Sequence, residues 1–161
     1  MKVGITMGDI FMINRKSLAL ASGKTDSDVW PIAIADFSYN GIVELNRDLI
    51  TDYGGTFIGS DNLRENCAGR LQYAIDMVLQ DNSYLENDVY YRAAWIWERL
   101  VMSHLFHDGN KRAALASMLA YLERNHITIY LPDHMVDRIQ HQMINKTVDL
   151  FAIARQLKKC R

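Results

Sequence analysis

The sequence predicts a mainly α-helical bundle with one small β element, and three observations support this fold class. Only two prolines occur in 161 residues, and both stand where the hydrophobic pattern already breaks. Apolar residues recur at helical spacing in several long segments, which are rich in strong helix formers. One glycine-bounded segment with β-branched and aromatic residues, 56–59, interrupts the helical pattern and predicts a small β-hairpin or an extended flap.

The first clear helix is predicted over residues 42–52. Ile42, Leu45 and Leu49 have the spacing of one helical face. The glycine pair that follows this segment is a common signal for a helix C-terminus. The flap therefore begins directly after a helix that packs on the core.

The other helices follow from the same periodicity and from turn residues between them. Ser60 is the expected N-cap of a helix from about 61 to 79, with a break near Gly69. A long helix over 86–106 carries His104 on its apolar stripe, behind Trp97 and Leu100. Further elements are predicted as helices at 111–125, 133–145 and 148–159, the last capped by Thr147, with an extended piece at 127–131.

Composition excludes several classes of protein. The formal net charge of −1 gives no global electrostatic reason to bind nucleic acid or an anionic membrane. The two cysteines are too few and too far apart for a disulfide framework or a zinc site. No run of 18 apolar residues occurs, and the N-terminus lacks the order of charges that a signal peptide has. We therefore expect a cytoplasmic protein.

The segment 104–112 joins the two longest predicted helices and carries most of the chemistry. Gly109-Asn110-Lys111-Arg112 opens a helix, where free backbone N–H groups and the helix dipole favour an anion such as phosphate. Asp108 supplies a carboxylate for Mg²⁺, and His104 supplies a general base. Together these groups indicate phosphoryl or nucleotidyl transfer. Taken singly, His104 also fits a hydrogen-bonded core histidine, and Asp108-Gly109-Asn110 an ordinary turn.

The string HLFHDGNKR at 104–112 resembles the signature of the Fic/Doc family at every fixed position. Residues 49–55 and 59–61 are similar to the family's first helix and flap, and the resemblance extends over about 41–159. It implies a Fic/Doc-type helical bundle whose catalytic domain spans 41–161. Residues 1–40, which include a predicted short helix near 17–21, then form an N-terminal extension packed on the core.

The resemblance also implies a role for each site residue. His104 is the catalytic base toward a hydroxyl of a target protein, and Asp108 binds Mg²⁺. Gly109, Asn110, Lys111 and Arg112 bind the phosphates of ATP, while Phe106 anchors the loop as a structural residue. The flap that positions the target, by strand addition, consists of Gly54, Gly55, Thr56, Phe57, Ile58 and Gly59.

Two departures from the common Fic pattern favour the death-on-curing (Doc) branch. Lys111 stands where Fic adenylyltransferases usually have glycine, and Leu115 stands where they have a second arginine. The implied activity is a toxin kinase that transfers the γ-phosphoryl group of ATP to a translation factor such as elongation factor Tu. Ala113 and Ala116 replace polar residues of Doc relatives, which affects the details of nucleotide contact. The alternatives are a protein adenylyltransferase (AMPylator) and a catalytically silent binding module.

Regulation by a separate antitoxin is expected because no inhibitory helix motif is present. That motif has Ser or Thr four residues before a Glu that precedes Gly or Asn. Asp61 stands at that position before Glu65-Asn66, and Asn82 before Glu86-Asn87. Neither segment fits, so the inhibitory element is expected on another chain.

Two further interpretations are less consistent with the sequence. His107-Asp108 forms the pair of an HD phosphohydrolase, but that site needs an upstream histidine, and His104 is the first histidine in the chain. Direct nucleic-acid binding is disfavoured because Lys111 and Arg112 make too small a basic patch.

Overall fold

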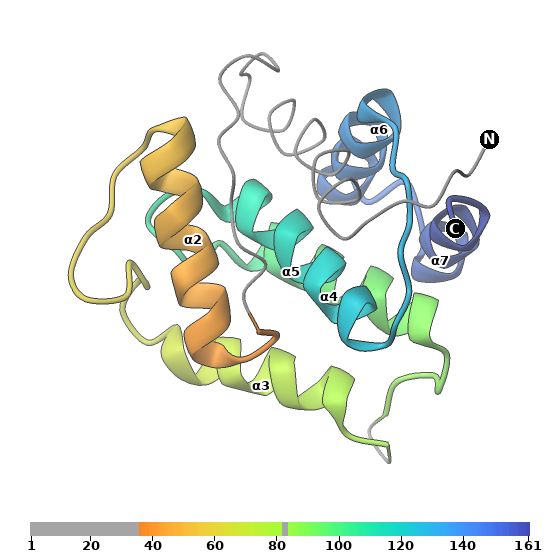
Figure 1. The fold of residues 1–161 in the computed structure, drawn as a ribbon, viewed down its shortest axis with the longest axis horizontal. Helices are drawn as coiled ribbons and strands as arrows, with labels where there is room; N and C mark the ends of the chain where they lie inside the picture. Colours follow the sequence, from red (N-terminus) through yellow and green to blue (C-terminus); the bar gives the residue numbers. More distant parts are fainter. Residues whose placement is uncertain (1–35, 82–83) are drawn as a thin grey trace.

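The computed structural model describes residues 36–81 and 84–161. This part of the chain is mainly helical, as predicted, and its helices surround one hydrophobic core (Figure 1). The predicted helix near 17–21 and most of the predicted N-terminal extension, residues 1–35, lie outside the described residues. The helices that the structure describes are α2 (Tyr39–Tyr53), α3 (Ala68–Leu79), α4 (Val89–Ser103), α5 (Asn110–Arg124), α6 (Asp133–Ile144) and α7 (Leu150–Lys159).

Helix α4 is the centre of the fold. It contacts α3, α5, α6 and α7, and Figure 1 shows it beside α5 in the middle of the molecule. The six consecutive residues 92–97 are all buried, which is more than one full turn, so this part of the helix is covered by protein on every side. The end of α4 is therefore held firmly, and the segment that leads from it to α5 begins from a rigid support.

Side-chain caps fix three helix starts. Ser38, Asp88 and Asp149 accept hydrogen bonds from the backbone N–H groups of the third residue after each of them. The predicted cap by Thr147 was wrong, because α7 begins at Leu150 with Asp149 as its N-cap. The carboxylate of Asp149 also complements the positive end of the helix dipole.

The predicted helix over 61–79 was too long at its N-terminal end. Residues 61–67 form a loop, and α3 begins at Ala68 without a side-chain cap, so Ser60 caps nothing. Asn62 and Asn66 have left-handed backbone conformations, with φ of 58° and 63°, which end any right-handed helix. The expected break at Gly69 does not occur, since this residue lies within the first turn of α3.

Among the described residues, no helix has the length and apolarity that crossing a bilayer requires. The sole isolated β-bridge in this part of the chain pairs Leu63 with Phe106 in antiparallel orientation. It joins the loop before α3 to the loop between α4 and α5.

The junction of α3 and α4 is held by the buried side chain of Arg92. Its Nη1 donates to the carbonyl oxygens of Met77, Val78 and Gln80 at 3.2, 3.0 and 2.7 Å. Its Nε donates to the carbonyl oxygen of Glu86 at 3.0 Å. One guanidinium thus satisfies the carbonyl groups that the end of α3 leaves without helical partners.

We expect Arg92→Met to destabilise the fold strongly. The substitution leaves the buried carbonyl oxygens of Met77 and Val78 without this donor, which should cost about 2–4 kcal/mol of the free energy of unfolding. Urea denaturation followed by circular dichroism measures this loss. Arg155→Met, which makes the same change at an exposed position on α7, is the control and should cost less than about 0.5 kcal/mol. Equal losses in the two variants would contradict the role given to Arg92.

Candidate functional site

Residues 104–109 form the loop between α4 and α5, and His104 is its first residue. Helix α4 ends at Ser103 because His104 adopts a left-handed conformation, with φ of 46° and ψ of 51°. This backbone turn takes the chain out of the helix before position 104. The expectation that His104 lies on the buried stripe was therefore wrong: its side chain is exposed. An exposed imidazole is open to an incoming ligand.

The loop is braced by the side chain of Asn110. Its Oδ1 accepts from the backbone N–H of Phe106, and its Nδ2 donates to the carbonyl oxygen of Phe106, both at 2.9 Å. Phe106 is buried in the core with 3% exposure. Both amide atoms of Asn110 are therefore used inside the loop, which leaves its backbone N–H as the group free to face a phosphate.

The start of α5 has the features of an anion site. Gly109 precedes the helix with φ of 76°, and no side chain caps the first turn. The first turn contains no acidic residue, while Lys111 is exposed there. Since Ala113 is the first residue whose N–H bonds back to Gly109, the N–H groups before it have no helical acceptor. A side chain at Gly109 would approach Nδ2 of Asn46 to 2.9 Å, so the loop needs glycine here.

The Asp108 side chain faces both α5 and the flap. Its Oδ1 accepts from the N–H of Gly109 at 2.7 Å, and its Oδ2 accepts from the N–H of Thr56 at 2.9 Å. The Nη2 of Arg112 lies 4.0 Å from Oδ1. The side chain remains 42% exposed, so the carboxylate is held in place and is still accessible to solvent.

Arg112 lies under the flap and is mostly covered. Its Nη1 donates to the carbonyl oxygens of Gly54 at 3.0 Å and of Leu49 at 3.4 Å. Burial lowers the pKa of its guanidinium, and the charges of Asp108 and Tyr53 partly oppose this shift. A further negative group would be stabilised here, because the cation has lost much of its hydration.

The flap, Gly54–Gly59, does not form the predicted hairpin. It is an irregular loop followed by a turn, because Gly54, Gly55 and Gly59 have φ of 90°, 128° and 72°. These conformations break a strand ladder. In a hairpin the N–H of Thr56 would pair with a neighbouring strand. Here it donates to the Oδ2 of Asp108 instead.

The outer part of the flap rests on α2. The guanidinium of Arg47 lies 4.8 Å from the centre of the Phe57 ring and donates to the carbonyl oxygen of Ser60 at 2.8 Å. The side chain of Ile58 is 50% exposed. The structure thus holds the flap at both ends and presents Ile58 to solvent.

Two buried asparagines that the sequence analysis missed connect these parts. The Nδ2 of Asn46 donates to the carbonyl oxygen of Asp108 at 3.0 Å. The Nδ2 of Asn62 donates to the Oδ1 of Asn46 at 2.8 Å, and its Oδ1 accepts from the N–H of Ile58. A sequence signal existed for Asn46, because a polar residue four positions after Ile42 stands on an otherwise apolar face.

The donor set fits Mg²⁺ only together with a ligand that supplies oxygens. Among residues 36–81 and 84–161, no group of three or more His, Cys, Asp or Glu side chains is arranged to hold a metal. Mg²⁺ is commonly bound by one or two carboxylates plus phosphate oxygens and water. The accessible carboxylate of Asp108 beside an uncapped helix start matches that mode of binding.

These features define a helical protein with a polar site in the loop between its two central helices. A protein-family model described as "Fic/DOC family" matches residues 36–122, which is more than half of the chain. The chain therefore belongs to the Fic/DOC family. This family transfers groups derived from nucleotides onto proteins, in general with ATP and Mg²⁺, and some members are inactive.

Among solved structures, the chain is similar to Fic-1 (residues 134–508) from C. elegans. The TM-score is 0.59 at 21% sequence identity, and the match covers 99% of this chain and 51% of that chain. At this identity the likeness shows the fold, and the chain spans about half the length of the Fic-1 structure. No curated protein matches the sequence.

We expect Gly55→Ala to separate the flap from Asp108. A Cβ at Gly55 would lie 2.6 Å from Oδ2 of Asp108, whereas one at Gly54 meets nothing within 4 Å. Both glycines have positive φ, so Gly54→Ala controls for backbone strain. Hydrogen exchange of the Thr56 amide should be about tenfold faster in Gly55→Ala than in Gly54→Ala, because only the first loses this hydrogen bond. Equal exchange rates would show that Asp108 does not hold the flap.

Proposed function

We propose that this chain is a Doc-like protein kinase, which transfers a phosphoryl group from ATP to a Ser or Thr hydroxyl of a target protein. The observation that carries this proposal is the arrangement of the loop 104–109. It places an exposed histidine at one end and an uncapped helix start with two cations at the other. A base and a phosphate site on one short, braced loop are what phosphoryl transfer requires.

In this proposal His104 acts as the general base. The hydroxyl oxygen of the target bonds to the γ-phosphorus while His104 takes the hydroxyl proton. The bond from the γ-phosphorus to the bridging oxygen breaks, and ADP leaves with that electron pair. The exposure of His104 supports this role, because a protein side chain can reach it without a rearrangement of the core.

The opposite end of the loop binds phosphate. The backbone N–H groups of Asn110 and Lys111, the Lys111 ammonium and the Arg112 guanidinium provide donors and positive charge. Gly109 permits the close approach of the backbone. Asp108 would hold Mg²⁺, which when bound neutralises charge on the phosphates.

The proposal that the γ-phosphoryl group is transferred rests on the distribution of charge along α5. The residue one turn after Arg112 is Leu115, which is apolar and completely buried. No cation therefore stands at this position on α5. With Lys111 in addition, the positive charge is concentrated at the first turn. This favours the γ-phosphoryl group over the adenylyl group. Adenylyl transfer is the second candidate, supported by the Fic/DOC membership itself, and a silent binding module is the third.

The proposed partners follow from the resemblance and from the flap. A translation factor such as elongation factor Tu is the proposed target, and the chain would act as a cytoplasmic toxin inhibited by a separate antitoxin. The flap residues Thr56, Phe57 and Ile58 would position the target segment. The exposure of Ile58 supports an apolar contact there, in place of the strand addition that a hairpin would have offered.

Intact-mass measurement of purified elongation factor Tu, incubated with the chain, ATP and Mg²⁺, tests this proposal. We expect a gain of about 80 Da, the mass of one phosphoryl group. His104→Ala should abolish the gain while leaving ATP affinity within about twofold, because the imidazole binds no nucleotide group in this mechanism. A gain of about 329 Da would establish adenylyl transfer instead. No transfer to this or other translation factors by folded protein would favour the silent module.

Removal of the Asp108 carboxylate should abolish the effect of Mg²⁺ on the affinity for ATP. We expect Mg²⁺ to strengthen ATP binding by about tenfold in the wild type and to have little effect in Asp108→Ala, which lacks the proposed ligand. Isothermal titration with and without Mg²⁺ measures both affinities. Glu44→Ala, an exposed carboxylate on α2, is the control. The assignment of Asp108 fails if Mg²⁺ strengthens binding equally in both variants.

A further inference from the structure

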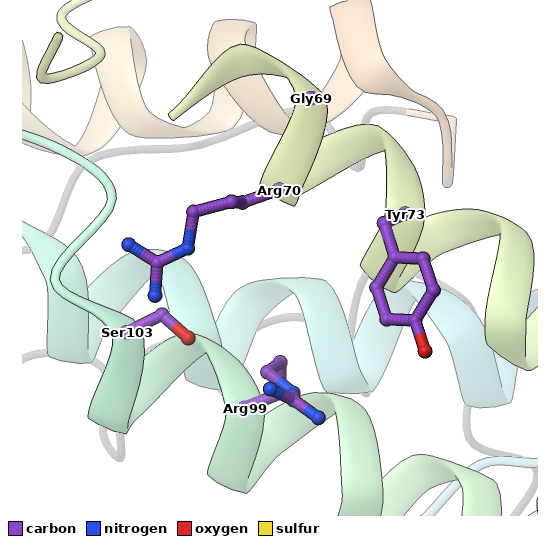
Figure 2. Close-up of a pocket in the computed structure, with 5 residues that line it drawn as sticks. All are labelled: Gly69, Arg70, Tyr73, Arg99 and Ser103. Carbon is purple, nitrogen blue, oxygen red and sulfur yellow. The ribbon is translucent and has the colours of Figure 1, made fainter. Parts of the chain in front are cut away.

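A cavity of about 230 Å³ lies between the start of α3 and the end of α4, outside the nine-residue signature. Figure 2 shows that its side chains come from both helices and that Arg70 extends from α3 toward Ser103 on α4. The proposed mechanism uses none of them. The lining residues are Gly69, Arg70, Tyr73, Arg99 and Ser103.

The cavity wall carries two positive charges that no carboxylate neutralises directly. Among the described residues, neither Arg70 nor Arg99 has a carboxylate oxygen within 4 Å, although the charge of Glu98 acts on Arg99 through space. Arg70 makes one weak contact, 4.0 Å from its Nη1 to the sulfur of Cys67. The N–H donors of both guanidinium groups therefore remain available to a ligand in the cavity.

Arg99 is also held in position. Its guanidinium carbon lies 4.8 Å from the centre of the Trp95 ring, a cation–π contact that leaves the edges of the planar group free. Ser103 adds a hydroxyl donor beside Arg70, whereas the hydroxyl of Tyr73 points away from both of them (Figure 2). A cavity lined by two arginines and a hydroxyl is suited to a planar, negatively charged acceptor such as a carboxylate.

The position of the cavity connects it to the target rather than to the nucleotide. Ser103 directly precedes His104, the proposed base, whereas the phosphate donors stand at the other end of the loop, on α5. Gly69 and Arg70 begin α3, just after the segment that bridges to Phe106 through Leu63. The cavity therefore adjoins the end of the loop that carries the proposed base.

We propose that the cavity between α3 and α4 binds an aspartate or glutamate side chain of the target protein, close in sequence to the hydroxyl that is modified. The site is a specificity determinant, since it selects acidic segments and contacts none of the reacting atoms. This inference rests on the proposed function, in which His104 acts on a protein hydroxyl.

Peptide binding to the ¹⁵N-labelled full chain tests the inference without requiring catalysis. The probes are two nonapeptides with a central serine, flanked by glutamates in one and by glutamines in the other. The glutamate peptide should shift the backbone amides of Gly69 and Ser103 in a saturable way. The glutamine peptide should bind at least about tenfold more weakly, because it lacks the charge that the arginines recognise.

Variants assign the binding to the cavity. Arg70→Gln and Arg99→Gln should each weaken the glutamate peptide about tenfold, whereas Arg155→Gln, the same charge change on α7, should leave its affinity unchanged. Thermal unfolding confirms that each variant is folded. Equal binding of the two peptides, or shifts that persist in the Arg70→Gln/Arg99→Gln double variant, would overturn the inference. So would the absence of saturable shifts at millimolar peptide.

A titration with MgATP separates this inference from the alternative that the cavity binds the nucleotide. MgATP should bind the wild type and the double variant with equal affinity, since its phosphates are assigned to α5. A loss of ATP affinity in the double variant would reassign the cavity to the nucleotide.

Turnover then connects the cavity to catalysis. With a protein substrate that the wild type modifies, the double variant should raise KM about tenfold and leave kcat within about twofold. If the wild type modifies no protein, the proposed function fails, while the peptide titration still decides what the cavity binds.

Discussion

The carbonyl group of Asp108 is the point on which the geometry of the site depends. It accepts hydrogen bonds from Asn46 at 3.0 Å and from Asn62 at 3.3 Å, and both asparagines are completely buried. Buried amides are costly unless they are satisfied, so this network tolerates little displacement. It fixes the backbone from which the carboxylate of Asp108 and the start of α5 both project. Helix α2, the end of the flap and the loop 104–109 are thereby held as one unit.

The same network makes the flap part of the site. Thr56 donates to the carboxylate of Asp108, and Gly54 accepts from Arg112. The two side chains proposed to meet the metal and the phosphates thus hold the first part of the flap, from Gly54 to Thr56. A ligand that draws either side chain toward itself changes a flap contact. In the proposed function, nucleotide binding would therefore act on the flap through the hydrogen bonds at Gly54 and Thr56.

Sequence periodicity predicted most helices but not where the loops around the site begin. Trp97, Leu100 and the residues around them carry a strong helical pattern, and α4 is found there. The pattern did not predict that His104 leaves the helix, because the left-handed turn depends on the Leu63–Phe106 pairing and on the Asn110 brace, which are contacts between distant segments. The hairpin failed for a local reason: the same glycines that suggested a turn have conformations that exclude strands.

The signature at 104–112 was visible in the sequence. The residues that hold this segment in place, and the cavity beside it, were not. Signature residues are neighbours in the chain, so their spacing alone brings them together on one loop. Asn46 and Asn62 act across more than 40 residues on Asp108, and Arg70 reaches the cavity beside Ser103 from another helix. Such placements follow from how α2 and α3 pack beside α4 and α5, which periodicity does not determine. A chemistry shared across a family can thus be recognised locally, while the residues that select a target are found only once the helices are in place.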